Sequence, residues 1–239
     1  MDELYVIARR VLLDALDALG QHRNATILVG AQAIYLHTGD ADLVVAEYTT
    51  DADLALDPGL LSKNPPIEQV LEGAGFYSST STIGIWKTRR RTSESCDIDV
   101  QVDLLVPARV SPGSGRRSAR LPGHGVNAAR KVDGLEGVLV DQAEHDIGSL
   151  EPEVDPRVIR TKVAGPGALL VLRLGSILTD TRSATNGKRS IELLADLFGN
   201  RGSEGAVMAA RAVQPMMDAD EIRLTSEVLA GDLLNALRR

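Results

Sequence analysis

The sequence has few of the residues that mark several common classes of protein. It holds a single cysteine, Cys96, so it can form neither an internal disulfide nor a cysteine metal cluster. Aromatic residues make up 3% of the chain, which leaves few rings to stack single-stranded bases. Its apolar stretches, such as residues 168–172, are far shorter than the roughly 20 residues of a membrane-spanning helix. No signal peptide is recognisable, and we therefore expect a cytoplasmic protein without a membrane span.

The chain has ample material for a hydrophobic core but an uneven distribution of charge. Of its 239 residues, 44% are hydrophobic, and the net charge of −7 argues against a general nucleic-acid binder. Residues 1–86 carry a net charge of −8, residues 87–131 one of +6, and residues 132–239 one of −5. The basic middle would attract a polyanion, or its cations could simply solvate the tip of a hairpin; four of them are Lys87, Arg89, Arg90 and Arg91.

The first quarter of the sequence alternates between helical and extended patterns. Apolar residues at helical spacing predict an amphipathic helix over 3–20. A short β-branched run predicts a strand over 26–29, followed by a turn at Gly30 and a helix over 31–37. A second β-rich run extends over 43–56. This order predicts a strand, a tight turn, a helix and a second strand.

Further elements continue to the C-terminus. The patterns predict a helix over 67–74 and four strands, at 77–89, 96–106, 137–140 and 158–163. Residues 107–125, rich in proline, glycine and arginine, are expected to form an exposed loop. From Pro166 onward the chain looks helical, with helices over 166–178, 190–198, 206–213 and from 218 to the end. We predict an α+β domain with a mixed sheet and flanking helices over 1–163, followed by a helical domain over 164–239.

Pairs of carboxylates suggest a metal site. Asp51 and Asp53 lie at positions i and i+2 of a predicted strand, so their side chains share one face. Divalent ions such as Mg²⁺ prefer carboxylate oxygens, and nucleotidyl transfer uses such ions. Asp97, Asp99 and Asp103 alternate with apolar residues in a later strand, so all three also share a face. We expect one of these three to meet Asp51 and Asp53.

A glycine turn before a helix offers a site for phosphate. Gly30, Ala31 and Gln32 stand between a predicted strand and a predicted helix, where backbone N–H groups and the helix dipole favour anions. Each of these signals is common in isolation. Their order, with the turn first, the Asp-x-Asp strand next and another aspartate strand later, predicts that all three elements surround one pocket.

Two groups of residues carry a family resemblance. The runs Ile27–Ala33 and Thr50–Leu54 look like the signature of the polymerase-β-like nucleotidyltransferases. A downstream pattern is similar to that of the AbiEii group of toxins, which includes the mycobacterial MenT toxins; it comprises Pro166, Gly167, Ala168, Leu169, Leu170, Arg173, Arg182, Gly187, Lys188, Arg189, Glu192, Asp196 and Leu197. The resemblance covers about residues 25–200.

The resemblance implies roles for individual residues. Asp51 and Asp53 would bind Mg²⁺ or Mn²⁺ and take part in catalysis, with Asp103, ahead of Asp99, as the third carboxylate. The nucleoside triphosphate would be bound by the phosphate turn and by two downstream cations, namely Gly30, Ala31, Gln32, Arg173 and Lys188. Arg173 stands in an otherwise apolar helix, where a charge needs a partner or an anionic ligand.

The resemblance also implies a reaction, the transfer of a nucleoside monophosphate from a triphosphate to an acceptor hydroxyl. The acceptor would be RNA or protein, and the basic stretch 87–131 beside the aspartate strand favours a tRNA 3′ end. The chain would then be the toxin of a toxin–antitoxin pair, with a cognate antitoxin as partner. One alternative is a small-molecule nucleotidyltransferase of the antibiotic-modifying kind. Another is a nucleotide-binding regulatory module, because Ala31 stands where the family usually has glycine or serine.

Overall fold

The computed structural model describes residues 3–38, 50–79, 82–111 and 117–169, together with scattered residues beyond them. The chain divides into two compact units, Met1–Arg173 and Leu174–Arg239. Nearly all of the described residues belong to the first unit.

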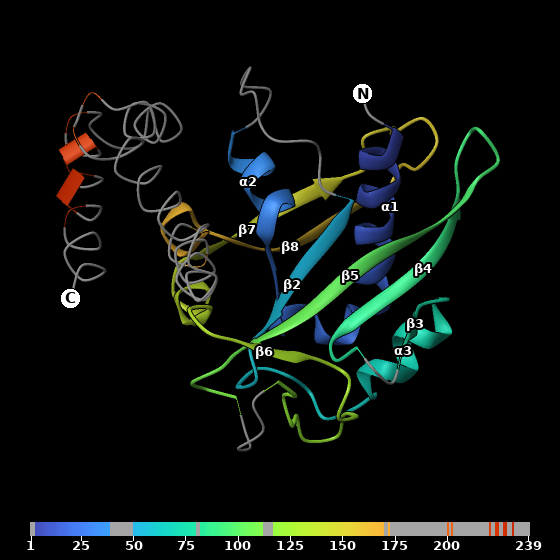
Figure 1. Cartoon of the computed structure of the whole chain (residues 1–239), viewed down its shortest axis with the longest axis horizontal. Helices are drawn as coiled ribbons and strands as arrows, with labels where there is room; N and C mark the ends of the chain where they lie inside the picture. The colour runs from blue at the N-terminus through green and yellow to red at the C-terminus, as the bar shows by residue number, and fades with distance from the viewer. Residues whose placement is uncertain are drawn as a thin grey trace, which may run out of the picture. The chain divides into compact units, whose positions relative to one another are not determined.

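The first unit combines helices and strands in a mixed order (Figure 1). The helices are α1 (Glu3–Ala18), α2 (Gly30–Thr38) and α3 (Ile67–Gly73), with the 3-10 turns η1 (Gly20–Ala25) and η2 (Glu136–Leu139). The strands are β1 (Thr26–Val29), β2 (Asp51–Leu56), β3 (Tyr77–Ser78), β4 (Ile85–Arg91), β5 (Asp97–Pro107), β6 (Arg130–Val132), β7 (Gln142–Gly148) and β8 (Val158–Ala164).

Within the described residues, these eight strands form one mixed sheet. Its order is β3-β4-β5-β2-β1-β8-β7, and β6 pairs with the end of β5 beyond β4. The pairs β2–β5, β1–β8 and β5–β6 are parallel, whereas the other neighbours are antiparallel. The unit is therefore an α+β domain built on an open mixed sheet.

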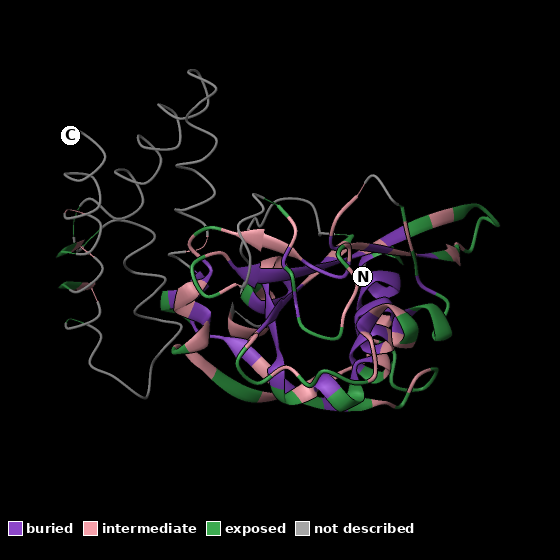
Figure 2. Ribbon diagram, turned by 90° about the horizontal axis from the view of Figure 1, so that it is seen from below, coloured by how far each residue is buried: buried purple, intermediate pink, exposed green. Residues whose placement is uncertain are grey.

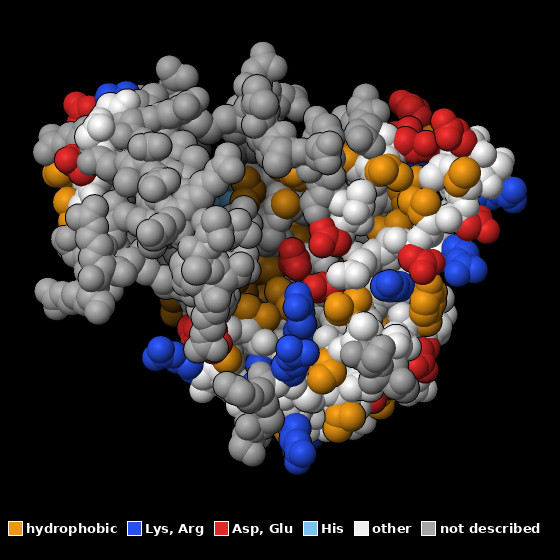
Figure 3. All heavy atoms as spheres, viewed as in Figure 1, with side chains coloured by type: hydrophobic (Ala, Val, Ile, Leu, Met, Phe, Trp, Pro, Cys, Tyr) orange, Lys and Arg blue, Asp and Glu red, His pale blue; other side chains and the backbone are white. Residues whose placement is uncertain are grey.

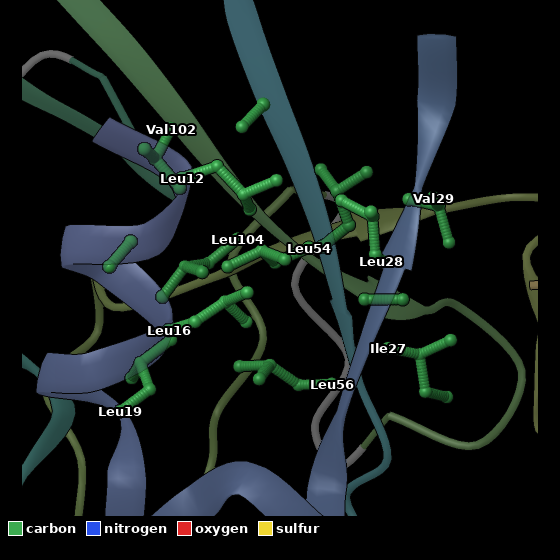
Figure 4. Packing of buried hydrophobic residues seen from close by; sticks show 14 of the residues in the cluster. Leu12, Leu16, Leu19, Ile27, Leu28, Val29, Leu54, Leu56, Val102 and Leu104 are labelled. Carbon is green, nitrogen blue, oxygen red and sulfur yellow. The ribbon is translucent and has the colours of Figure 1, made fainter. Parts of the chain in front are cut away.

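Alternation along the central strands sorts the side chains between the two faces of the sheet. On one face, Leu54 and Leu104 pack against Leu12 and Leu16 of α1, and all four are almost fully buried (Figure 4). Burying one such side chain contributes about 1.5–3 kcal/mol. Buried residues are concentrated in α1 and the middle strands (Figure 2). The intervening residues of β2 and β5, which include the aspartates, consequently lie on the other face.

Most of the predicted elements in the described ranges are present, with small changes at their ends. The strand predicted over 77–89 is wrong, because the structure divides it into β3 and β4. Gly84 interrupts it with a φ of +72°, and a side chain there would come within 2.5 Å of the backbone nitrogen of Arg130. A glycine is needed at this turn because L side chains rarely adopt such a conformation.

Two other parts of the sheet differ from the prediction. Residues 137–140, predicted as a strand, lie mainly in the 3-10 turn η2, because local bonds such as Val138 N–H to Leu135 O close the chain on itself. An apolar run of that length does not distinguish a strand from a turn. The prediction also missed β6 and β7. The edge strand β7 exposes residues on both faces, so its sequence has no apolar alternation.

Several predictions concern residues outside the described ranges. These are the start of the β-rich run at 43–49, the cations Arg173, Arg182 and Lys188, and the helices over 190–198 and 206–213. Among the residues that the structure does describe, no helix has the length and apolar character needed to cross a bilayer.

Candidate functional site

Strand register brings three carboxylates together on the face of the sheet opposite α1. In the parallel pair β2–β5, Asp53 lies directly opposite Asp103, and Asp51 lies opposite Gln101. Neighbouring strands are about 4.7–4.9 Å apart, and directly opposed residues project to the same side. Figure 3, drawn from the viewpoint of Figure 1, shows a group of acidic side chains with basic side chains close to it. The register alone therefore creates a carboxylate cluster from residues about 50 positions apart.

Gly30 lies against this cluster at the start of α2. Its φ is +70°, and a Cβ atom built there would lie 2.1 Å from Oδ2 of Asp53. The preceding residue, Val29, is paired with Asp53 across β1 and β2. Both the backbone conformation and the close approach therefore require glycine, and they bring the beginning of α2 into contact with the Asp53 carboxylate.

Asp103 is the most enclosed member of the cluster, and both of its oxygens are engaged. Only 4% of the residue is exposed. Gln101 donates a hydrogen bond from Nε2 to Oδ1 over 2.7 Å, and Arg130 donates one from a terminal guanidinium nitrogen to Oδ2 over 2.5 Å. The Nε atom of Arg130 is buried without a hydrogen-bond partner in the part of the chain that the structure describes. Asp103 is thus held by a residue 27 positions away in sequence.

The electrostatics of the cluster reflect its excess of negative charge. Burial, reinforced by the charges of Asp103 and Asp51, raises the pKa of Asp53 to about 7, although Arg130 acts in the opposite direction. Burial also raises the pKa of Asp103, against the lowering effects of Arg130 and Gln101. One arginine therefore does not fully compensate the three carboxylates, and an additional cation would stabilise their ionised forms.

The residues present suit a divalent ion in their chemistry but are not arranged around one. Among the described residues, no group of three or more histidine, cysteine or acidic side chains has the arrangement of a metal site. Each oxygen of Asp103 accepts one hydrogen bond, from Gln101 or from Arg130, and keeps a further lone pair. Carboxylate oxygens are nevertheless the ligands that Mg²⁺ prefers, and the raised pKa of Asp53 indicates that a cation would be favoured here.

Gln32, which is predicted to contribute to the phosphate turn through the backbone, has its side chain engaged with α1 and β2. The residue is 1% exposed; its Oε1 accepts a hydrogen bond from Nε of Arg9 over 3.0 Å, and its Nε2 donates one to the backbone oxygen of Asp51 over 3.3 Å. It therefore braces the start of β2 against α1. Ala31, beside it, is half-buried at the start of α2. Arg173 and Lys188, the two predicted triphosphate cations, lie outside the described residues.

The other two aspartates of β5 lie away from the cluster. Asp99 is opposite Arg89 of β4, with which it forms an ion pair over 3.4 Å, and Asp97 is opposite Arg91 near the turn of the hairpin. A side-chain hydrogen bond with Tyr77 lowers the pKa of Asp99. Of the three candidates for the third carboxylate, the structure thus places Asp103 beside Asp53.

The sequence patterns did not identify Arg130 or Gln101 as part of the site. Arg130 was recognisable only as one member of a basic stretch, because its partner lies on another strand. Gln101 stands at i−2 from Asp103, so their shared face was predictable, but the hydrogen bond between them was not.

Comparison of the chain with models of protein families, with curated proteins and with solved structures gave no match. The resemblance to the polymerase-β-like nucleotidyltransferases consequently stays a prediction from the sequence motifs.

Proposed function

We propose that the chain is a magnesium-dependent nucleotidyltransferase of the polymerase-β-like kind, similar to the AbiEii and MenT toxins. One observation supports this most directly. The β2–β5 register sets Asp51, Asp53 and Asp103 on one face of the sheet, and the glycine turn that opens α2 lies in contact with Asp53. A carboxylate cluster beside a helix N-terminus suits a triphosphate with its metal ions.

The proposed reaction transfers a nucleoside monophosphate and releases pyrophosphate. The start of α2 at Gly30 and Ala31 binds the triphosphate, and Asp103 polarises the acceptor hydroxyl and draws off its proton. The hydroxyl oxygen bonds to the α-phosphorus, and the bond between the α-phosphorus and the bridging oxygen breaks. Arg130 and Gln101 orient the Asp103 carboxylate for this role.

Asp51 and Asp53, together with Asp103, are the residues that would hold Mg²⁺ or Mn²⁺ at this site. When bound, the ions supply the positive charge that offsets the triphosphate and the developing negative charge during transfer. In their absence, burial and then the charges of Asp103 and Asp51 raise the pKa of Asp53.

We propose a tRNA 3′ end as the acceptor. Lys87 and Arg89 of β4 lie on the same sheet face as Asp103, because their partners in β5 are Gln101 and Asp99. A polyanion attracted to the cationic stretch 87–131 would thus come close to the carboxylates. Addition of a nucleotide to the tRNA 3′ end would block aminoacylation of that tRNA. This effect agrees with the role of a toxin whose activity a cognate antitoxin inhibits.

A second candidate is a nucleotide-binding module without turnover. The observation that favours it is the Arg130–Asp103 ion pair, which occupies an oxygen of the third carboxylate. A module of this kind would bind triphosphate but transfer nothing.

The test is transfer of label from each α-³²P nucleoside triphosphate to total tRNA in the presence of Mg²⁺. Three proteins are compared: wild type, Asp53→Asn, which removes one carboxylate of the cluster, and Asp97→Asn, which removes an exposed carboxylate on the same face of β5. Labelled tRNA with wild type and Asp97→Asn but not with Asp53→Asn would support the proposal.

Triphosphate binding without transfer to any acceptor would instead favour the binding module. Transfer to an aminoglycoside but not to tRNA would favour the small-molecule enzyme.

A further inference from the structure

The sheet face that carries the carboxylates continues across two more strands to an exposed aromatic ring. Asp51 is opposite Gln101, Gln101 is opposite Lys87, and Lys87 is opposite Tyr77. Directly opposed residues project to the same side of a sheet. These four residues therefore form one row across β2, β5, β4 and β3, with the candidate catalytic carboxylates at one end and a tyrosine at the other.

Tyr77 is the most exposed aromatic residue of the described ranges. It is 42% exposed, whereas Tyr35 is half-buried and Tyr5, Phe76 and Trp86 are exposed by 6% or less. A side-chain hydrogen bond joins it to Asp99, which is itself paired with Arg89. The polar end of the ring is thus held on the sheet face, and its apolar surface stays accessible to a partner. Tyrosine rings with one polar and one apolar part are enriched at binding interfaces.

Lys87 supplies a cation between the ring and the carboxylates. In the residues that the structure describes, its ammonium group makes no hydrogen bond and no ion pair. Arg89, two residues farther along the same face, is 67% exposed at its side chain and is paired directly with Asp99. Lys87 has only a longer-range attraction to Asp99, because the residue opposite it in β5 is the neutral Gln101.

An exposed ring beside an unpaired cation fits a single-stranded nucleic acid. The ring stacks on a base, the cation binds a phosphate, and neither contact depends on sequence. The spacing suits the end of a single-stranded nucleic acid. Three β-strand spacings separate Tyr77 from Asp51, which amounts to roughly 14 Å between their backbones. A short single-stranded segment that rests on Tyr77 and Lys87 can place its terminal hydroxyl at the carboxylates.

We propose that Tyr77 and Lys87 bind the unpaired 3′ end of an RNA acceptor, with Tyr77 stacked on a base and Lys87 on the phosphate next to it. This inference rests on the proposed nucleotidyl transfer for its orientation, with the 3′ hydroxyl towards Asp103. It adds a binding surface on β3 and β4 that lies outside the metal and triphosphate contacts.

The test is binding of a 5′-fluorescein single-stranded RNA by fluorescence anisotropy, without metal ion or triphosphate. Tyr77→Ala should weaken binding about tenfold, whereas Tyr77→Phe, which keeps the ring, should bind nearly as wild type does. Lys87→Gln should weaken binding several-fold and lower the salt dependence by the equivalent of about one phosphate contact. Lys63→Gln, which removes an exposed lysine before α3, is the matched control and should change little. Thermal unfolding of each variant establishes that it is folded.

Wild-type affinity in both Tyr77→Ala and Lys87→Gln would overturn the proposal. So would equal weakening by Lys63→Gln, which would indicate only general charge attraction. If the two variants bind RNA more weakly but the wild-type protein transfers no nucleotide, the proposed RNA-binding surface stands and the proposed enzymatic function is refuted. If folded Tyr77→Ala and Lys87→Gln transfer nucleotide to tRNA at the wild-type rate, the proposed RNA-binding surface is refuted and the proposed enzymatic function stands.

Discussion

Two positions on β5 carry the same residue type on the same face of the sheet and give it opposite properties. In the interior of the strand, Asp103 is buried beside two other carboxylates, and burial raises its pKa. Four residues earlier, Asp99 is exposed and bonded to Tyr77 and Arg89, and its pKa is lowered. The spacing of the aspartates thus identifies the sheet face that they share. The neighbouring strands determine which aspartate is buried beside other carboxylates, where a bound cation would stabilise its charge.

The largest predicted difference between the carboxylate cluster and Asp99 is in catalysis. Asp53→Asn and Asp103→Asn should each reduce nucleotidyl transfer by at least about a thousandfold, because a carboxylate ligand to catalytic metal contributes several kcal/mol to the transition state. Asp99→Asn should stay within a few-fold of wild type. The measurement is the initial rate of label transfer at saturating Mg²⁺. Equal losses in Asp99→Asn and Asp103→Asn would contradict the assignment of Asp103 as the third carboxylate.

A second prediction concerns the glycine that touches Asp53. Gly30→Ala places a methyl group 2.1 Å from the Asp53 carboxylate at a φ of +70°, so either the turn or the carboxylate has to move. We expect activity to fall about a hundredfold or more and the free energy of unfolding to fall by about 1–3 kcal/mol.

Gly73→Ala is the matched control for this change. Gly73 ends α3, and a Cβ atom there would meet no heavy atom within 4 Å. This substitution should leave activity unchanged and stabilise the protein by up to about 1 kcal/mol in urea unfolding. Equal activities of the two variants would argue against a tight approach of Gly30 to the site.

The pH dependence of stability should differ between the carboxylate cluster, which includes Asp53 of β2, and the exposed Asp99 of β5. Asp53 has a pKa of about 7 in the folded protein against an ordinary value of 3.8. The folded state therefore binds more protons than the unfolded state between these values, and stability falls as the pH rises through this window. Without metal, the wild type should lose about 1–2 kcal/mol between pH 5.5 and 8 relative to Asp53→Asn.

Asp99 gives the contrasting case for this measurement. Its pKa is lowered in the folded state, so its stabilising contribution is present above the ordinary pKa and is lost only as the pH falls through the folded value. Asp99→Asn should accordingly show the wild-type change between pH 5.5 and 8 in urea unfolding with EDTA. If the free energy of unfolding of the wild type does not change over this pH range, folding does not raise the pKa of Asp53. If Mg²⁺ binds at the cluster, adding it should reduce the pH dependence of the wild-type stability.

The site illustrates how far local sequence patterns extend. The pairing of Asp51 with Asp53 on one face, the glycine turn before α2 and the shared face of Asp97, Asp99 and Asp103 all follow from periods of two or from turn chemistry. The choice among the three β5 aspartates depends on the β2–β5 register, which joins residues about 50 positions apart, and no local pattern specifies it. The proposed role of Tyr77 likewise depends on its pairing with Lys87 between β3 and β4, which no local pattern specifies.

Arg130 is the clearest case of a residue that only the fold could reveal, and it gives the smallest predicted effect. Because its guanidinium offsets part of the charge of Asp103, Arg130→Gln should make the cluster more negative and tighten Mn²⁺ binding about fivefold. Arg89→Gln, which removes the partner of Asp99, should leave Mn²⁺ affinity unchanged; both can be measured by electron paramagnetic resonance of free Mn²⁺. Weaker Mn²⁺ binding in Arg130→Gln would show instead that the arginine holds Asp103 in the position of a ligand. Tighter binding accompanied by faster transfer would mean that the ion pair competes with the metal, and that the protein keeps its third carboxylate occupied until a cation replaces the arginine.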